Sequence, residues 1–388
     1  MADYTKLEPF LKLLADKNGS DLYLSTGTMP AIKIQGEMRF IGREPLKLGQ
    51  TRQLAASMLT EDQLAKFDRE LELNAALQLP GIGRFRVNVF MQRGELAMVI
   101  RYIKSDIPTI SSLNLPQVLH DIVMERRGLI LVVGTTGSGK STTLASMIDF
   151  RAEQMPGHIL TIEDPIEFTF KHRRSVVNQR EVGVDTHSYS AALKEAMREA
   201  PDVIMIGEIR DRATMEHALA YADTGHLCLS TLHATNAHQA LDRIIHFFPP
   251  EARDQLLMDL SLNLKAIISQ RLLISANGQR TPAVEIMINS PFIAELIKRG
   301  HVDQIKDAME KSQQGGMQTF DMSLYQLWKD GRISREEALK NADSRANLEW
   351  RMNFGGTMKE SLAPDEEATP EQQQRRKQAQ EDDFPKLD

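Results

Sequence analysis

The sequence is poor in the features that mark disulfide-bonded, secreted and membrane-spanning proteins. It holds one cysteine in 388 residues, which excludes internal disulfides and a four-cysteine zinc site. No apolar run approaches the ~18 residues of a membrane span, and the first residues lack the basic and apolar regions of a signal peptide. The net charge of −6 disfavours extensive nucleic-acid binding. We therefore expect a cytoplasmic protein without a transmembrane segment.

A phosphate-binding loop is the strongest signal in the chain. Residues 134–141 fit the pattern G-x-x-x-x-G-K-[ST]. They follow an apolar run at 129–133 that is typical of a strand buried on both faces, and they precede a predicted helix at 142–150. Lys140 is expected to reach the β- and γ-phosphates of ATP, and Ser141 to ligate Mg²⁺. The predicted nucleotide-binding residues are Gly134, Thr135, Thr136, Gly137, Ser138, Gly139, Lys140, Ser141 and Thr142.

Carboxylates follow two further predicted strands. Glu163 and Asp164 come after the apolar run at 158–162, and Glu208 comes after Val203–Ile206. Carboxylates at this end of a parallel strand face the ligand crevice. We expect Glu163 and Asp164 to position Mg²⁺, partly through water, and Glu208, helped by Glu163, to act on the attacking water. The alternative is an acidic surface, and the neighbouring phosphate loop favours the catalytic interpretation.

Two histidines bound a third buried strand, which contains the single cysteine. We expect Thr231 or His233 to hydrogen-bond the γ-phosphate, and His226 is a second catalytic candidate. The alternative for each histidine is a structural role. A His/Cys metal site has poor support, because Cys228 points into a predicted sheet core.

The chain divides into four predicted segments. Residues 1–104 form a small α/β domain, 105–116 a linker, 117–356 a parallel sheet with helices on both faces, and 357–388 a disordered, acidic tail. After Pro249-Pro250 the pattern predicts mostly helix, apart from 283–288. In the first domain, the strand at 83–91 has an apolar face and a basic face. Arg86 on that strand and Arg101 on the returning strand are candidate arginine fingers, and the alternative is a solvated basic face.

Taken together, these motifs resemble the secretion and type IV pilus ATPase superfamily over roughly residues 1–350. The loop at 134–141, the acidic segment 162–167, the strand ending in Glu208 and the segment 225–233 match its four conserved boxes in order. The resemblance implies a PAS-like α/β N-terminal domain and a RecA-like P-loop ATPase domain with a helical C-terminal part. It also implies Mg-dependent ATP hydrolysis.

Within that superfamily the chain is similar to the PilT/PilU retraction ATPases. Assembly and secretion ATPases generally carry an additional N-terminal domain and often a four-cysteine zinc motif. The single cysteine of this chain excludes that zinc motif. One motif departs from the PilT pattern: residues 292–299 read Phe-Ile-Ala-Glu-Leu-Ile-Lys-Arg in place of Ala-Ile-Arg-Asn-Leu-Ile-Arg-Glu. This departure and the tail favour the PilU-like accessory form.

The resemblance implies partners as well as an activity. We expect a homohexamer, alone or mixed with or stacked on a second retraction ATPase. It would act in the cytoplasm at the inner-membrane base of the pilus, on a platform protein, and without nucleic acid. Two alternatives stay open: a nucleotide-binding regulatory partner with little turnover, and a RecA-like nucleic-acid translocase.

Overall fold

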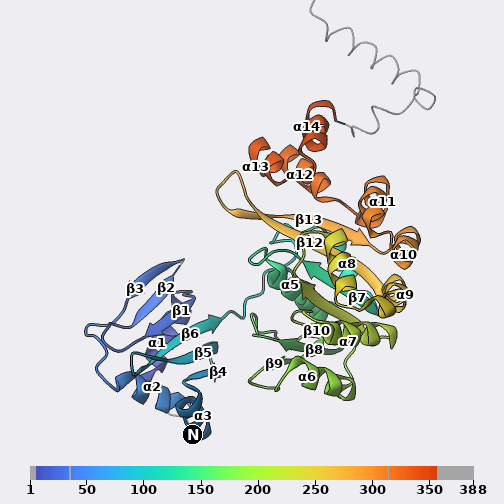
Figure 1. The fold of residues 1–388 in the computed structure, drawn as a ribbon. Coiled ribbons are helices and arrows are strands. Elements are labelled where there is room, and N and C mark those ends of the chain that lie inside the picture. The colour runs from blue at the N-terminus through green and yellow to red at the C-terminus, as the bar shows by residue number, and fades with distance from the viewer. Residues whose placement is uncertain (1–5, 35, 313, 356–388) are drawn as a thin grey trace, which may run out of the picture. The chain divides into compact units, whose positions relative to one another are not determined.

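The computed structural model describes residues 6–34, 36–312 and 314–355, and the predicted tail at 357–388 lies outside them. The chain forms two compact units, whose boundaries fall at Leu272/Leu273, Ala283/Val284 and Gln318/Thr319. The first unit contains two separate sheets (Figure 1). The domain boundaries proposed from the sequence remain predictions.

The N-terminal sheet is antiparallel, with the strand order β3-β2-β1-β6-β5-β4. The sequence anticipated the long hairpin of β5 and β6 and missed the edge strands β3 and β4. The elements of this part are α1 (Glu8–Asp16), β1 (Asp21–Leu24), β2 (Ala31–Ile34), β3 (Glu37–Phe40), α2 (Gln50–Met58), α3 (Glu61–Glu70), β4 (Glu72–Leu79), β5 (Gly83–Gln92) and β6 (Glu95–Ile103).

The two faces of this sheet differ because side chains alternate along a strand. On β5, Phe85, Val87 and Val89 are fully buried in a core to which α1, α2 and α3 also contribute. Arg86 lies on the opposite face, and its register partner on β6 is Arg101. The sequence pattern therefore placed Arg86 correctly on the non-core face, and the register places Arg101 beside it.

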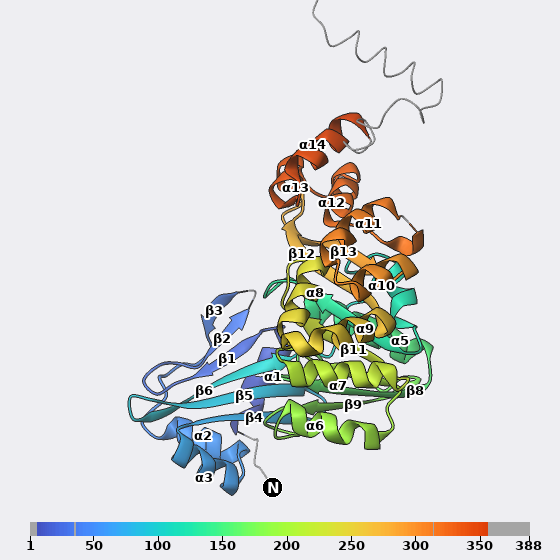
Figure 2. The same ribbon diagram turned by 45° about the vertical axis from the view of Figure 1, so that its right-hand side comes forward.

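The second sheet has seven strands in the order β13-β12-β7-β11-β10-β8-β9 (Figure 2). The strand pairings from β12 to β9 are all parallel. Its strands are β7 (Gly128–Val133), β8 (Gly157–Glu163), β9 (Ser175–Glu181), β10 (Val203–Ile206), β11 (Leu227–Leu232), β12 (Leu264–Ile274) and β13 (Arg280–Ile288). The α-helices along this stretch of chain are α4 (Val118–Val123), α5 (Lys140–Gln154), α6 (Tyr189–Ala196), α7 (Arg212–Asp223), α8 (Ala237–His246), α9 (Arg253–Asn263), α10 (Pro291–Lys298) and α11 (Ile305–Lys311), with short 3-10 turns at Met197–Glu199, Pro250–Ala252, Val302–Gln304 and Gln314–Gly316.

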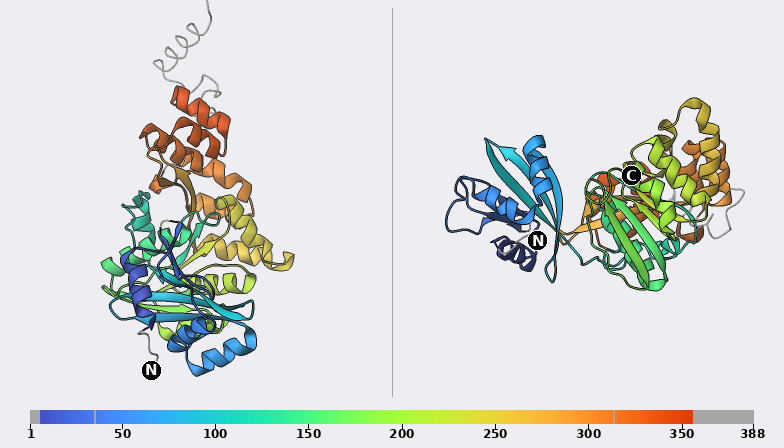
Figure 3. Two further views of the ribbon diagram at one scale, coloured as in Figure 1. Left: turned by 90° about the vertical axis from the view of Figure 1, so that its left-hand side faces the viewer. Right: turned by 90° about the horizontal axis from the view of Figure 1, so that it is seen from below.

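Helices cover both faces of this sheet, as the all-apolar strands predict (Figures 2 and 3). On β7, Leu129 and Leu131 enter one apolar cluster, while Ile130 and Val132 enter the other. Neighbouring β11 is buried along its whole length, and Cys228 within it is fully buried. Burial raises the pKa of the Cys228 thiol to about 12.

One element of this region was not expected. The segment after Pro249-Pro250 is mostly helical, as predicted, but Leu264–Ile274 forms the strand β12 beside β7. Its sequence interrupts short apolar runs with Lys265, Ser269, Gln270 and Arg271 and shows no strict alternation, so periodicity does not distinguish a buried helix from a buried strand. Pairing with β7 decides between them.

The second compact unit combines the turn end of β12 and β13 with α12 (Phe320–Lys329), α13 (Arg335–Asn341) and α14 (Arg345–Phe354). Phe320, Leu324 and Leu348 lie in its own apolar core. Asp321 is buried and accepts hydrogen bonds from the backbone N–H groups of Asp343 and Ser344 at 2.8 and 3.1 Å. These contacts fix the turn that leads into α14.

Candidate active site

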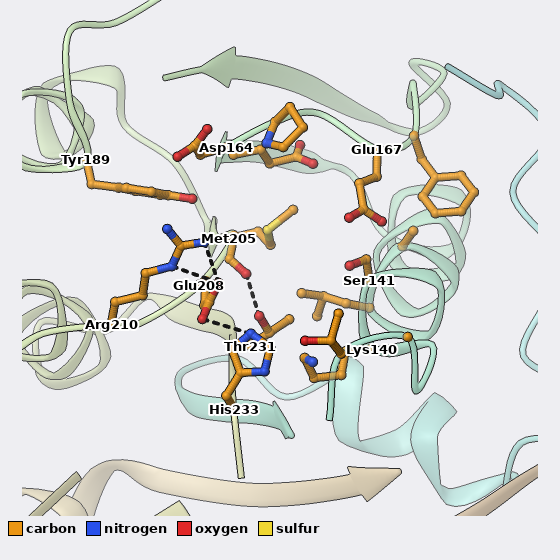
Figure 4. A pocket seen from close by; sticks show the side chains of 18 of the residues that line it. Lys140, Ser141, Asp164, Glu167, Tyr189, Met205, Glu208, Arg210, Thr231 and His233 are labelled. Carbon is orange, nitrogen blue, oxygen red and sulfur yellow. Dashed lines mark hydrogen bonds and ion pairs between the residues drawn. The ribbon is translucent and has the colours of Figure 1, made fainter. Parts of the chain in front are cut away.

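A pocket of about 230 Å³ lies at the carboxyl ends of β7, β8, β10 and β11. Because these strands are parallel, the segments that follow them meet at one edge of the sheet. Lys140 and Ser141 lie on one side of the pocket, and Glu208, Arg210 and Tyr189 on the other (Figure 4). The sheet thus brings a phosphate-binding loop and several carboxylates to one place.

The phosphate-binding loop closes around the ammonium group of Lys140. Lys140 Nζ donates to the carbonyl oxygens of Gly134 and Thr135 at 2.9 and 3.0 Å. An ammonium group carries three donors, so one remains for a phosphate oxygen. Ser138 Oγ is buried without a hydrogen-bond partner among the described residues. Unsatisfied donors in a glycine loop at a helix start match the needs of a bound phosphate.

Gln270 on β12 supports this loop from the neighbouring strand. It is 4% exposed, and its Oε1 accepts a hydrogen bond from Thr143 Oγ1 at 2.6 Å. A Cβ added to Gly139 would lie 2.8 Å from Gln270 Nε2, and Gly139 has a φ of +89°. Only glycine satisfies both the backbone conformation and the close approach at this position.

Glu208 lies between two basic side chains. Arg210 donates from Nε to Glu208 Oε2 at 2.9 Å, and its Nη2 lies 2.8 Å from the same oxygen. His233 Nε2 lies 3.2 Å from the other oxygen, Oε1. Burial, reinforced by the nearby charge of Lys140, lowers the pKa of His233. Glu208 is therefore held at both oxygens, with 16% of its side chain exposed to the pocket.

Glu163 occupies a more enclosed position at the end of β8. Its Oε1 accepts hydrogen bonds from Thr161 Oγ1 at 2.7 Å and Gln179 Nε2 at 3.1 Å. Burial raises the pKa of Glu163 to about 7, although both hydrogen bonds oppose that shift. Glu163 and Glu208 thus sit in different environments within one pocket.

Tyr189, at the start of α6, brings a phenol to the same pocket. A Cβ on Gly207 would lie 2.8 Å from its hydroxyl oxygen, so the glycine is needed for this close approach. Burial raises the pKa of Tyr189, and Asp164 adds to the shift. The hydroxyl therefore stays protonated and can donate a hydrogen bond into the pocket.

Most of the predicted site residues meet here, and some do not. Lys140, Glu208 and His233 line the pocket together with Thr136, Gly137, Ser141, Glu163, Asp164 and Thr231. The remaining predicted residues of the loop, Gly134, Thr135, Ser138, Gly139 and Thr142, lie beside it along the chain without lining the pocket.

His226 is not brought to this pocket, contrary to the prediction. It precedes β11 whereas His233 follows that strand, and a six-residue strand spans about 20 Å. His226 lines a different cavity at the opposite edge of the sheet. Arg86 and Arg101 lie on the N-terminal sheet and do not line the nucleotide pocket of their own chain.

Sequence reasoning missed Arg210, Tyr189 and Gln270. Arg210 offered a signal, because it follows Glu208 by two positions at the end of a buried strand. Tyr189 and Gln270 reach the pocket region from α6 and β12, so their proximity depends on strand order rather than on local spacing.

Comparison with known proteins assigns the family. The family model for type II/IV secretion system proteins matches residues 34–350. The type IV pilus ATPase PilU of Pseudomonas aeruginosa is 48% identical over 351 residues, which cover 90% of this chain and 92% of that protein. The retraction ATPase PilT of the same organism is 42% identical over 346 residues, 89% of this chain and all of that protein.

The chain belongs to the PilT/PilU family of type IV pilus ATPases.

A solved structure agrees with this assignment. The crystal structure of the pilus retraction motor PilT with bound ADP is similar, with a TM-score of 0.81, 41% identity and coverage of 88% of this chain and 98% of that one. The expected mixed α/β fold and the ATPase class are confirmed. The protein described here is thus an ATPase that binds a nucleotide. Within the described residues, no helix is long and apolar enough to cross a membrane.

Proposed function

We propose that this chain hydrolyses ATP to drive type IV pilus retraction, as a PilU-like accessory motor. The observation that carries the catalytic part is the position of Glu208 opposite the loop that holds Lys140 (Figure 4). The accessory role is supported by the likeness to PilU and by α10, where Ala294 and Glu295 replace the Arg-Asn pair of the PilT pattern.

Hydrolysis in this pocket needs a positioned water and a stabilised phosphate. Lys140 and the N–H groups of the loop bind the β- and γ-phosphates. Glu208 accepts a proton from the water while the water oxygen forms a bond to the γ-phosphorus. The bond from that phosphorus to the bridging oxygen breaks, which releases ADP and inorganic phosphate. Arg210 and His233 orient the Glu208 carboxylate during this step.

The oxygen-rich wall of the pocket suits a magnesium ion. Ser141, Asp164 and Glu163 offer oxygen ligands, which Mg²⁺ prefers together with phosphate oxygens. In the described part of the chain, no cluster of three or more His, Cys, Asp or Glu residues forms a metal site by itself. The metal would therefore enter with the nucleotide and neutralise phosphate charge.

A homohexamer explains why part of the predicted machinery lies elsewhere. The pocket volume of about 230 Å³ is below the usual range for ligand sites, ~300–1,000 Å³. Arg86 and Arg101 of a neighbouring subunit would complete it. At the inner-membrane base of the pilus the ring would act on a platform protein, alone or with a second retraction ATPase.

Turnover of the purified chain tests the catalytic proposal. We expect Mg-dependent release of phosphate from ATP, and its loss in Lys140→Ala, which removes the cation that meets the phosphates. Normal nucleotide binding with negligible turnover by the parent protein would instead support the regulatory-partner alternative. Turnover that required added nucleic acid would support the translocase alternative.

Twitching assays test the accessory role. We expect cells that lack this chain to retain part of their twitching when the second retraction ATPase is present, and cells that hold only this chain to twitch poorly. Full twitching with this chain as the single retraction ATPase would contradict the accessory role and leave the ATPase assignment intact.

A further inference from the structure

A second cavity lies at the opposite edge of the seven-stranded sheet, where β8, β10 and β11 begin. Its volume is about 410 Å³, and none of its lining residues belongs to the nucleotide pocket. The charged and titratable side chains around it are Arg126, Arg151, His158, Asp202 and His226. Two arginines thus face one carboxylate, a formal charge of +1 with both histidines neutral.

Arg151 is a buried cation in the lining of this cavity. The residue is 4% exposed, and Nη1 donates to the carbonyl oxygens of Val123 and Glu125 at 2.5 and 2.7 Å. Within the described residues no carboxylate forms an ion pair with it. A guanidinium has five N–H donors, so the groups on Nη2 and Nε remain. Burial lowers the pKa of Arg151, although Asp202 partly offsets the effect.

The other polar groups compensate this positive charge only in part. Asp202 directs Oδ2 to the backbone N–H of His158 at 2.7 Å. Arg126 is exposed and forms no ion pair with any described residue. His226 Nδ1 lies 3.1 Å from Thr224 Oγ1 and 3.2 Å from the Tyr221 carbonyl oxygen, while Nε2 has no partner among the described residues. A buried cation with spare donors in a concave site is costly without an anion.

We propose that this cavity binds an anion of phosphate chemistry, through Arg126 and Arg151. Guanidinium groups match tetrahedral oxyanions by paired N–H donors. A structural role for Arg151 accounts for two of its five donors only. The phosphate group would belong to a free small anion or to a lipid headgroup, which share this chemistry.

Binding of inorganic phosphate and pyrophosphate to full-length Lys140→Ala protein tests the site, because this variant lacks the main phosphate contact of the nucleotide loop. The ³¹P linewidth of each probe gives its dissociation constant. We expect Arg126→Gln in this background to weaken binding about tenfold or more, since it removes a charge-assisted contact. Arg127→Gln is the matched control, since Arg127 is also exposed but does not line the cavity. We expect less than a twofold change there.

Two further experiments distinguish a free anion from a lipid headgroup and exclude misfolding as the cause of lost binding. Arg151→Lys keeps the charge and removes the paired donors, so it should weaken binding while thermal unfolding stays cooperative. Sedimentation with phosphatidylglycerol vesicles that is lost in Arg126→Gln and kept in Arg127→Gln would assign the phosphate to a lipid. Three results would overturn the proposal: no binding by the Lys140→Ala protein, equal loss of binding in Arg126→Gln and Arg127→Gln, or an Arg126→Gln effect confined to subunit assembly.

Discussion

Arg210 and Glu208 hold each other through two guanidinium nitrogens on one carboxylate oxygen, at 2.8 and 2.9 Å. The opposite oxygen of Glu208 faces His233. A carboxylate held at both oxygens keeps one orientation, and in the proposed mechanism the attacking water would lie between Glu208 and the phosphate loop. We therefore predict different effects for substitution of the proposed base, Glu208, and of Arg210, which orients it.

Glu208→Gln should bind ATP normally and lose turnover by about 10²–10⁴-fold, because shape is kept while the proton acceptor is lost. Equilibrium binding of a fluorescent ATP analogue and steady-state phosphate release measure the two effects. Glu216→Gln is the control, since Glu216 is a half-exposed glutamate on α7 paired with Arg212. Turnover at the parental rate in Glu208→Gln would assign the base elsewhere.

Arg210→Gln should lower kcat and leave KM for ATP nearly unchanged, because Arg210 contacts Glu208 rather than the phosphate loop. Its side chain is 61% exposed, and exposed ion pairs contribute about 1 kcal/mol at most, or about fivefold in rate. Arg212→Gln removes a comparably exposed arginine that contacts Glu216 and should leave kcat unchanged. A KM effect without a kcat effect would mean that Arg210 binds nucleotide directly.

Gln270→Leu should weaken ATP binding and lower the unfolding temperature. It leaves the buried Thr143 hydroxyl without its acceptor, which costs about 1–3 kcal/mol. Adding Thr143→Val should recover much of the stability, because it removes the orphaned hydroxyl. Gln279→Leu in the exposed turn after β12 is the control. Identical melting of Gln270→Leu and parent would show that the loop does not depend on β12.

Mixed rings test whether Arg86 and Arg101 act on a neighbouring subunit. The two arginines are register partners on adjacent strands, where like charges repel. Among the described residues, Asp21 forms an ion pair with Arg101, at 2.7 Å, and not with Arg86. Mixing Arg86→Ala or Arg101→Ala with Lys140→Ala subunits should give activity that depends non-linearly on the mixing ratio. Arg39→Ala, on the exposed strand β3, should give proportional dilution. Proportional dilution with all three variants would remove the arginines from the catalytic site.

The central part of the site follows from the sequence because its signals are local. A glycine loop after a buried strand, and acids directly after two more strands, need only a parallel sheet to meet. His226 shows the limit of that reasoning. Both histidines border the same strand, and only the direction of β11 decides which one reaches the nucleotide. Gln270 shows a second limit, because its role depends on β12 lying beside β7.

The burial of Cys228 has a practical consequence for following the motor at work. The only thiol of the chain lies inside β11 with its ionisation suppressed, so maleimide dyes should leave the folded protein unlabelled. A cysteine introduced at the exposed turn residue Arg93 would then be the sole reactive position. Fluorescence energy transfer between subunits labelled at this position could report subunit movement during ATP turnover, and Cys228 would not need to be replaced first.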